Sequence, residues 1–499
     1  MDLALRVLAI FAYGFILLVG IGVLAVLVLY LVDITQTKHA IRRNFPVIGR
    51  FRYLFEHLGE FFRQYFYAFD REELPFNRAE RSWVYRAAKG VDNTVAFGST
   101  RDLRRVGTVI YLNDPWPVLE TDVAEPGPVT IGPFCRAPYT TNSLINISAM
   151  SFGAISKPAV LALSRGAKRA GIWLNTGEGG LSPYHLEGGA DLIFQIGTAK
   201  YGVRDARGGL SDERLAAVAS HAQVKMFELK LSQGAKPGKG GILPGVKVTE
   251  EIATIRGIPV HVDSISPNRH PEIASAADLL DMIERVRSVT GKPAGFKTVM
   301  GTAGWVDALI QEIGRRGIES APDFITLDSG DGGSGAAPMP LIDSVGMPVR
   351  ESLPLLVDKL EAAGLRGRIK VVASGKMIIP SEAAWAFCVG ADFVNSARGF
   401  MFALGCIQAM RCNSNTCPTG VTTHNERLQR GLDPMDKAER VYHYAKTIVK
   451  EVGMIAHSCG VTEPRQLQRH HCRIVATDGR SMPLDELYPP SRSRSARAP

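Results

Sequence analysis

The sequence predicts an α/β fold: a (β/α)8 TIM barrel with an N-terminal transmembrane helix. Strand-like apolar runs alternate with helix-like stretches through the centre of the chain, and these runs end in glycine or polar residues. Alternating strands and helices form a parallel sheet, and eight such units are typical of a closed barrel. A long uncharged segment precedes them. By length alone, the 499 residues would also suit two or three domains.

Eight strand-like runs predict the barrel strands. The helix-like stretch KPAVLALSRGAKRAG follows the first run, and SDERLAAVASHA precedes the fourth. PEIASAADLLDMIERVRSV precedes the fifth run and RESLPLLVDKLEAAG the seventh, whereas no convincing helix follows the second. The runs are INISAMSFG (145–153), IWLNTGEGG (172–180), LIFQIG (192–197), MFELKLSQG (226–234), AGFKTV (294–299), FITLDSGDGG (324–333), IKVVASGK (369–376) and DFVNSARG (392–399).

Residues 1–36 are predicted to be a transmembrane anchor. From Val7 to Val32 the chain has 26 residues without a charge, and about 20 apolar residues in a helix span a bilayer. A cleaved signal peptide would have an apolar region of only ~7–15 residues before a small-residue cleavage site. Cations after the span outnumber Arg6 before it. The positive-inside rule therefore predicts a single-pass protein of the cell inner membrane, with the bulk of the chain facing the cytoplasm.

Composition divides the chain after the predicted anchor into four expected regions. Aromatic residues alternate with Arg and Glu over 45–69, so this segment either lies in the headgroup region of the membrane or forms a helix packed on the soluble domain. We expect a membrane-proximal and entry region at 37–130, a barrel at 131–430, a helical extension at 431–487 and a disordered tail rich in Pro, Ser and Arg at 488–499.

The net charge of +9 belongs to the ends of the chain. Eight cations cluster in two short stretches and the centre is nearly balanced, so we expect no nucleic-acid partner. The seven cysteines are odd in number in a long chain, which argues against a disulfide framework and favours a reducing compartment. The clustered cations are Lys38, Arg42, Arg43, Arg50, Arg52, Arg492, Arg494 and Arg497.

Polar residues and glycines gather at the ends of the predicted strands. Chemistry in a TIM barrel takes place at the C-terminal ends of the strands, so these residues are predicted to face one mouth. The last two runs end in SGK and SARG, and loops after strands seven and eight of such barrels often bind phosphate. A phosphate-bearing cofactor therefore fits. The strand-end residues are Met150, Ser151, residues 175–178, Lys230, Lys297, residues 328–333, Ser374, Gly375, Ala397 and Arg398.

The connection from Ser232 to His270 is unusually long. Loops of more than ~12–15 residues are uncommon and often functional. This loop is rich in glycine and carries Lys236 and Lys239. It is predicted to close over an anionic substrate; a solvated insertion is the alternative.

Three cysteines, Cys406, Cys412 and Cys417, lie within twelve positions. A zinc site would have four ligands, commonly in C-x2-C pairs, and a catalytic thiol would need one cysteine near a base. Three thiolates suit an iron–sulfur cluster, which cysteines hold. The segment follows the eighth strand, so such a cluster would lie near the barrel mouth.

Several stretches resemble the FMN-binding synthase domain of glutamate synthase. The segment GCIQAMRCNSNTCPTGV resembles the 3Fe–4S segment of that family, and the other stretches occur in the same order over residues 130–430. The resemblance implies an oxidoreductase in which reduced FMN in a barrel mouth delivers hydride to 2-iminoglutarate, made from 2-oxoglutarate and ammonia, to give glutamate. The other stretches are SAMSFGAIS, NTGEGG, SQGAKPGKGGILPGVKV, DSISP, DSGDGGSGAAP and GADFVNSARGFMFALGC.

The resemblance also implies residue roles. Lys230 and Lys236 would hold substrate carboxylates, because cations fix a dicarboxylate in one geometry, and Glu178 would serve in proton transfer. Lys297 would lie near the pyrimidine edge of the flavin and stabilise the charge of its reduced form. The other implied cofactor contacts are Met150 and Ser151 against the flavin, Gly332, Gly333, Ser374, Gly375, Ala397 and Arg398 around the ribityl phosphate, and Cys406, Cys412 and Cys417 on the 3Fe–4S cluster.

Two departures from the family pattern keep alternatives open. Full glutamate synthases begin with a glutaminase domain, whereas this chain begins Met1-Asp2 and then has the apolar span, so we expect ammonia from elsewhere. Ile242 stands in GGILPG where well-known synthases carry glutamine. The alternatives are a membrane-linked flavin oxidoreductase acting on another amino or keto acid and a non-catalytic scaffold on the same barrel. The electron donor stays open between ferredoxin and a quinone-linked partner.

Overall fold

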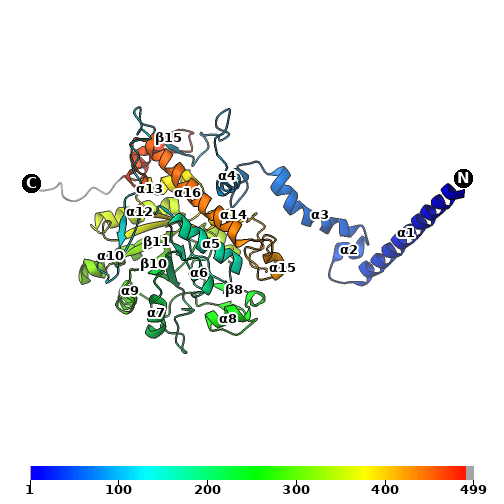
Figure 1. The fold of residues 1–499 in the computed structure, drawn as a ribbon, viewed down its shortest axis with the longest axis horizontal. Helices are drawn as coiled ribbons and strands as arrows, with labels where there is room; N and C mark the ends of the chain where they lie inside the picture. Colours follow the sequence, from blue (N-terminus) through cyan, green and yellow to red (C-terminus); the bar gives the residue numbers. More distant parts are fainter. Residues whose placement is uncertain (1, 490–499) are drawn as a thin grey trace, which may run out of the picture. The chain divides into compact units, whose positions relative to one another are not determined.

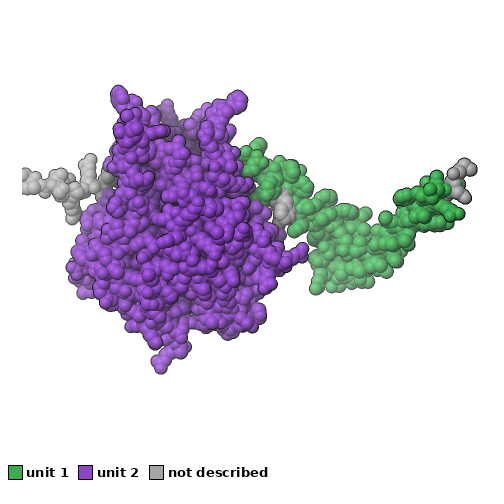
Figure 2. Space-filling model, in the orientation of Figure 1, with its two compact units in different colours: residues 1–80 green, residues 81–499 purple. Residues whose placement is uncertain are grey.

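The protein, seen in a computed structural model, is described over residues 2–489. Its contacts divide the chain into two compact units, residues 1–80 and residues 81–499 (Figure 2). Residues 490–499 of the tail predicted to be disordered lie outside the described residues.

The first unit consists of helices. Helix α1 spans Asp2–Thr35; its residues 3–35 form an apolar stretch whose large side chains are exposed, whereas Asp33 near its end is buried. Length and composition make this helix suitable for crossing a membrane, although a signal sequence has the same properties. The remaining helices are α2 (Ala40–Asn44), α3 (Gly49–Phe62) and the π-helix η1 (Arg63–Tyr67).

The second unit contains a closed barrel of eight parallel strands, which confirms the predicted TIM barrel. Each of the eight predicted runs contributes one strand, in chain order around the barrel. The ring closes where β13 pairs with β4, with Val394 opposite Ile145. The strands are β4 (Ile145–Ile147), β5 (Leu174–Asn175), β6 (Leu192–Ile196), β7 (Val224–Lys230), β10 (Ala294–Val299), β11 (Phe324–Asp328), β12 (Lys370–Ser374) and β13 (Phe393–Ser396).

Helices surround the strands (Figure 1), and the four predicted helices are confirmed as α5, α7, α9 and α12. Helix α5 begins where the Ser156 hydroxyl accepts the Ala159 N–H and ends at Gly171, whose φ of 73° suits glycine. The second β/α repeat of the barrel, which begins with β5, has only the short helix α6, as its sequence indicated. The helices are α4 (Arg78–Ala88), α5 (Lys157–Ala170), α6 (Pro183–Glu187), α7 (Asp212–Ala219), α8 (Glu250–Arg256), α9 (Ala276–Thr290), α10 (Gly304–Arg316), α11 (Met339–Ser344), α12 (Val349–Ala362), α13 (Pro380–Val389), α14 (Arg398–Leu404), α15 (Glu426–Gln429), α16 (Pro434–Ser458) and α17 (Leu484–Leu487).

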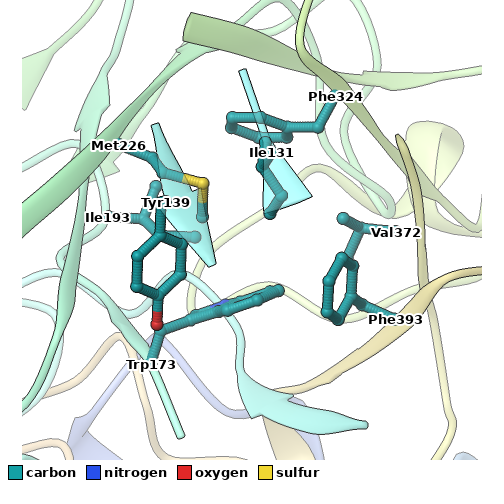
Figure 3. Close-up of a cluster of buried hydrophobic side chains, with 8 residues drawn as sticks. All are labelled: Ile131, Tyr139, Trp173, Ile193, Met226, Phe324, Val372 and Phe393. Atoms are coloured by element: carbon teal, nitrogen blue, oxygen red, sulfur yellow. The ribbon is translucent and has the colours of Figure 1, made fainter. Parts of the chain in front are cut away.

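A two-stranded hairpin closes the amino end of the barrel. Strands β2 (Val129–Ile131) and β3 (Tyr139–Thr141) are antiparallel, and they carry Ile131 and Tyr139 into a buried cluster (Figure 3). The other members of this cluster come from the barrel strands or the residues just before them, and Trp173 lies 4.9 Å from Phe393 between ring centroids. These members are Trp173, Ile193, Met226, Phe324, Val372 and Phe393. The barrel interior is therefore packed at this end, which leaves the opposite end for ligands.

The long C-terminal helix α16 packs against α5, α13 and α14. Gly166 permits this contact, because a β-carbon there would collide with Val441. Residues after α16 return to the entry region and form a three-stranded sheet with it. The strands of that sheet are β1 (Val109–Tyr111), β14 (Cys472–Val475) and β15 (Ser481–Pro483); two more, β8 (Ile242–Leu243) and β9 (Ser264–Ile265), pair within the long loop.

Candidate active site

A hollow of about 930 Å³, open to solvent, lies at the carboxyl ends of the barrel strands. A second hollow of about 440 Å³ shares six lining residues with it, so the two form one cleft. Gly332, Cys406 and Cys417 line neither hollow. The predicted residues lining the larger hollow are Met150, Ser151, Glu178, Lys230, Lys236, Lys297, Gly333, Ala397, Arg398 and Cys412; Ser374 and Gly375 line the smaller one.

Glu178 and Lys230 form an ion pair in the larger hollow. Lys230 is the last residue of β7, and its Nζ lies 2.5 Å from Oε1 of Glu178, which follows β5. Gly197 and Gly241 leave room for the carboxylate, because a β-carbon on either would approach it closely. Burial raises the pKa of Glu178, but the charges of Lys230 and Lys236 outweigh it and lower the value to about 2. Glu178 is therefore a carboxylate at neutral pH.

Two further cations line the same hollow. Lys236 is buried in the long loop, and its pKa falls to about 8, first through burial and then through the charge of Lys230. Arg256, the last residue of α8, donates hydrogen bonds to the Phe152 carbonyl at 3.1 Å and to Ser151 Oγ at 3.4 Å. Its Nε is buried without a hydrogen-bond partner. Within residues 2–489, neither Lys236 nor Arg256 has a carboxylate at ion-pair distance.

The long loop contributes one of its two predicted lysines to the cleft. Lys236 faces the cleft, whereas Lys239 is exposed and lines neither hollow. Arg256 was not singled out from the sequence. It lies in the same connection, and a basic residue ending a short helix before Gly257 was the only available signal.

Lys297 and two carboxylates lie on the barrel side of the cleft. Lys297 Nζ is 3.0 Å from Oδ2 of Asp328, the last residue of β11. Burial lowers the pKa of Lys297, but Asp328 and Glu228 outweigh it, so the net shift is upward. Lys297 is therefore a stable cation in this position.

Glu228 lies inside the barrel and was not predicted as a site residue. Its carboxylate accepts hydrogen bonds from Asn175 Nδ2 (2.8 Å), Gln195 Nε2 (2.7 Å) and Thr326 Oγ1 (2.6 Å). Gln195 and Lys297 both line the larger hollow. Glu228 therefore orients the residues beneath the cleft without touching a ligand there.

The smaller hollow has the features of a phosphate cradle at the ends of β12 and β13. Gly375 has a φ of 126°, and a β-carbon there would collide with Ser329; one on Gly333 would lie 2.7 Å from Arg398 Nε. Arg398 also donates to the Ser334 carbonyl at 2.9 Å. Asn395 Oδ1, in the lining, is buried without a hydrogen-bond partner. An open backbone and a guanidinium fit the phosphate of a bound ligand, whereas the Asn395 oxygen could accept a hydrogen bond from a hydroxyl of that ligand.

The three clustered cysteines follow α14. Cys412 lines the larger hollow, and Lys247 Nζ donates to its carbonyl at 3.1 Å and to the Ala154 carbonyl at 2.7 Å. Burial raises the pKa of Cys406 to about 11. Burial also raises the pKa of Cys417, but hydrogen bonds involving Thr419 and Thr422 outweigh it and lower it.

The cysteine thiols are not arranged as a closed ligand set. Among the described residues, no three His, Cys, Asp or Glu side chains lie close enough together to hold a metal ion. The donor chemistry suits a cluster, since soft thiolates ligate iron, but the side chains would have to turn toward one another. The cluster stays a prediction.

Comparisons with known proteins indicate one family. Residues 111–462 match the family model described as the conserved region in glutamate synthase. The chain is 38% identical over 511 aligned positions to a glutamate synthase large subunit-like protein, YerD, of Bacillus subtilis, covering 94% of this chain and 97% of that protein. It is 33% identical to the archaeal glutamate synthase [NADPH] of Methanocaldococcus jannaschii, over 66% of this chain and 61% of that one.

Among solved structures, a mandelate oxidase with benzoyl-formic acid overlaps 79% of this chain and 98% of its own, at 16% identity and a TM-score of 0.46. The family match covers well over half of the chain, and the Bacillus relative is aligned along nearly its whole length. This chain therefore belongs to the glutamate synthase family of oxidoreductases.

Proposed function

We propose that this protein reduces 2-iminoglutarate, formed from 2-oxoglutarate and ammonia, to glutamate, with FMN and a 3Fe–4S cluster as its cofactors. The observation that carries the proposal is the placement of Lys236 and Arg256 beside the Glu178–Lys230 pair: both cations are buried, and no carboxylate within residues 2–489 lies at ion-pair distance from either. Buried charges in proteins are normally paired. A ligand with two carboxylates would pair both.

The cleft offers groups for both ends of an FMN molecule. Ser374, Gly375 and Arg398 would hold its phosphate in the smaller hollow, and Met150, Ser151 and Lys297 would contact the ring in the larger one. Bound FMN supplies the hydride for reduction of the imine. The Lys297 ammonium offers a positive charge where negative charge develops on reduction.

The substrate end of the cleft has groups for binding and for proton transfer. Lys236 and Arg256 would each bind one carboxylate and so orient the imine carbon. The Lys230 ammonium can donate a proton to the developing amine nitrogen, with Glu178, 2.5 Å away, stabilising the ammonium and relaying its replacement. Because the pKa of Glu178 is about 2, Glu178 acts as an acceptor or relay at neutral pH and not as a resting acid.

The cluster would be held by Cys406, Cys412 and Cys417, near the cleft that Cys412 lines. A Cys412→Ser variant is expected to lose cluster iron, measured by metal analysis and absorbance, whereas Cys388→Ser, outside the segment, keeps it. Equal iron loss from both variants would contradict this assignment. When bound, the cluster would supply one-electron transfer, and the donor would be a protein such as ferredoxin or a quinone-linked partner.

Helix α1 would anchor the protein in the cell inner membrane, with the barrel facing the cytoplasm. Its apolar stretch over residues 3–35 and the cations that follow support this orientation. The anchored protein is expected to float with membranes after a high-salt wash and to require detergent for release. Release by salt alone would contradict the anchor.

The reaction itself is tested with the purified, flavin-loaded protein. The bound flavin is reduced under anaerobic conditions and then mixed with 2-oxoglutarate and ammonia. Rapid reoxidation with formation of glutamate is expected, and omission of ammonia should stop both. A flavin that stays reduced with both substrates present would overturn the proposed reaction.

A second substrate class is favoured by one observation. Ile242 and Leu243 of β8 line the cleft, and Ile242 offers no hydrogen bond where well-known synthases carry glutamine. A 2-oxo acid with an apolar portion would suit this wall. A panel of 2-oxo acids with ammonia, in the same reoxidation assay, separates the two classes.

A further inference from the structure

Helix α3 has one apolar face that is exposed to solvent. Its large apolar residues recur at i, i+3, i+4, i+7 and i+11, the pattern of one helical face. Phe51 is 55% exposed and Phe55 65% exposed, and their rings lie 6.5 Å apart. Arg52 and Glu56 lie on the opposite face. The apolar positions are Phe51, Leu54, Phe55, Leu58 and Phe62.

This helix is tied to the end of α1 by a buried carboxylate. Asp33 accepts hydrogen bonds from Arg50 Nε and from Arg50 Nη2, both at 2.8 Å, and from the Val47 backbone N–H at 3.0 Å. Gly49 lets α2 and α3 meet, because a β-carbon there would lie 2.8 Å from the Ile41 carbonyl oxygen. Helix α3 therefore starts at the point where the apolar helix ends.

Cations dominate the same region. Residues 36–55 contain five Lys or Arg and no Asp or Glu. Asp33 neutralises Arg50, whereas Lys38, Arg43 and Arg52 are exposed. A helix with an apolar aromatic face and flanking cations binds in the plane of a bilayer surface, and anionic lipids strengthen such binding.

From these features we propose that α3 lies in the headgroup layer of the membrane, with its aromatic face toward the acyl chains and its cations on anionic phospholipid headgroups. The proposal rests on the membrane anchoring by α1 proposed above. Helix α3 would be a second membrane contact that lies in the plane of the surface. The end of α1 lies next to the start of α3, and the hydrogen bonds of Asp33 to Arg50 and Val47 fix this arrangement. The partner is an anionic lipid bilayer.

The test uses the full chain reconstituted into vesicles, with tryptophan placed on either face of α3. The emission of the five native tryptophans, measured in the wild type, is subtracted. For the added tryptophan of the Phe55→Trp variant, we expect emission at shorter wavelength and strong quenching by phospholipid brominated near the headgroup end of its acyl chains. The Glu56→Trp variant, with the probe on the polar face, should show neither. Flavin content and absorbance check that both variants are folded.

Charge dependence is tested in the Phe55→Trp background. Quenching should increase as phosphatidylglycerol is added to phosphatidylcholine vesicles, and Arg43→Glu with Arg52→Glu should remove this increase. Arg207→Glu with Arg214→Glu, the same charge change at exposed positions of the barrel unit, should leave it intact. If quenching changes neither with the lipid charge nor on reversal of the charges of Arg43 and Arg52, the anionic-lipid assignment is overturned.

Two other outcomes are distinguishable. Blue-shifted emission of Phe55→Trp without lipid quenching would mean that α3 packs on protein, and equal quenching of both probes would mean that no face is selected; either result overturns the proposal. A protein that does not float with vesicles at all would instead contradict anchoring by α1.

Discussion

The two ends of the barrel bury charge in different ways. At the amino end, Asp323 accepts hydrogen bonds from Arg287 Nε and the Ala294 N–H, both at 2.8 Å, and Arg368 Nη2 lies 2.9 Å from its other oxygen. At the carboxyl end, Lys236 and Arg256 are also buried, but no carboxylate within residues 2–489 lies at ion-pair distance from them.

This difference separates stability from function. The charges at the amino end form ion pairs with one another, so removing one of them should destabilise the protein strongly. Among the described residues no carboxylate lies at ion-pair distance from the two cations at the mouth, which costs stability, and a ligand with carboxylates would offset this cost. Substitutions at the two ends should therefore affect different measurements.

The largest expected effect is on folding. Asp323→Asn would remove the buried anion that Arg287 and Arg368 share, and we expect a loss of about 3–5 kcal/mol in the free energy of unfolding, measured by denaturant titration. Asp281→Asn is the matched control, because Asp281 pairs with Arg316 at 2.6 Å but is 67% exposed, and it should change little. Equal losses of unfolding free energy in the two variants would mean that the buried ion pairs at the amino end contribute no more than a surface ion pair.

Glu178→Gln should act on catalysis. Loss of the carboxylate that pairs with Lys230 is expected to lower turnover about 10²-fold or more, measured by glutamate formation with reduced flavin. Glu187→Gln, at an exposed pair with Arg165, should retain activity. Full activity of Glu178→Gln would remove this pair from the proposed mechanism.

The same carboxylate predicts a pH effect. The pKa of Glu178 is lowered from 4.5 to about 2, so its contribution to stability is fully present above pH 4.5 and is lost as the pH falls toward 2. The wild type should therefore lose more unfolding free energy than Glu178→Gln over this interval. Identical pH profiles would mean that the ion pair does not persist in solution.

Ile242→Gln tests how the wall of the cleft at the barrel mouth selects its ligand. An added hydrogen bond to a charged ligand contributes about 1.5–3 kcal/mol, so 2-oxoglutarate should bind about ten- to a hundredfold more tightly, measured by flavin fluorescence. Val246→Gln, on the same loop but 61% exposed and outside the cleft, is the control. Lys239→Ala should be neutral. Weaker binding by Ile242→Gln would show that the wall is already matched to its ligand.

The smallest effect is expected beneath the cleft. Glu228→Gln removes one negative charge near Lys297 while preserving the shape of the side chain, so the flavin potential should become more positive. Thr326→Val, which removes one hydrogen bond to Glu228 but no charge, should shift it less. Both are measured by redox titration of the bound flavin, and equal shifts would indicate a packing effect.

Some residues of the candidate site can be predicted from the sequence, and others are identified only by the structure. Glu178, Lys230, Lys297 and Arg398 were predictable because each lies within three residues of the C-terminal end of a parallel strand, and all such ends meet at one mouth. Arg256 and Glu228 were not predictable. One is a basic residue on a short helix and the other lies inside a strand, and neither position carries a periodic signal.

The sequence by itself determined the barrel. Short apolar runs bounded by glycine and polar residues specify strands locally, and caps such as Ser156 and Gly171 specify where helices begin and end. Only the tertiary structure decided that the β2–β3 hairpin closes one end, that Lys239 stays outside the cleft, and that Arg256 enters it. These are contacts between segments far apart in the chain, and they arise from packing and charge burial that no local pattern records.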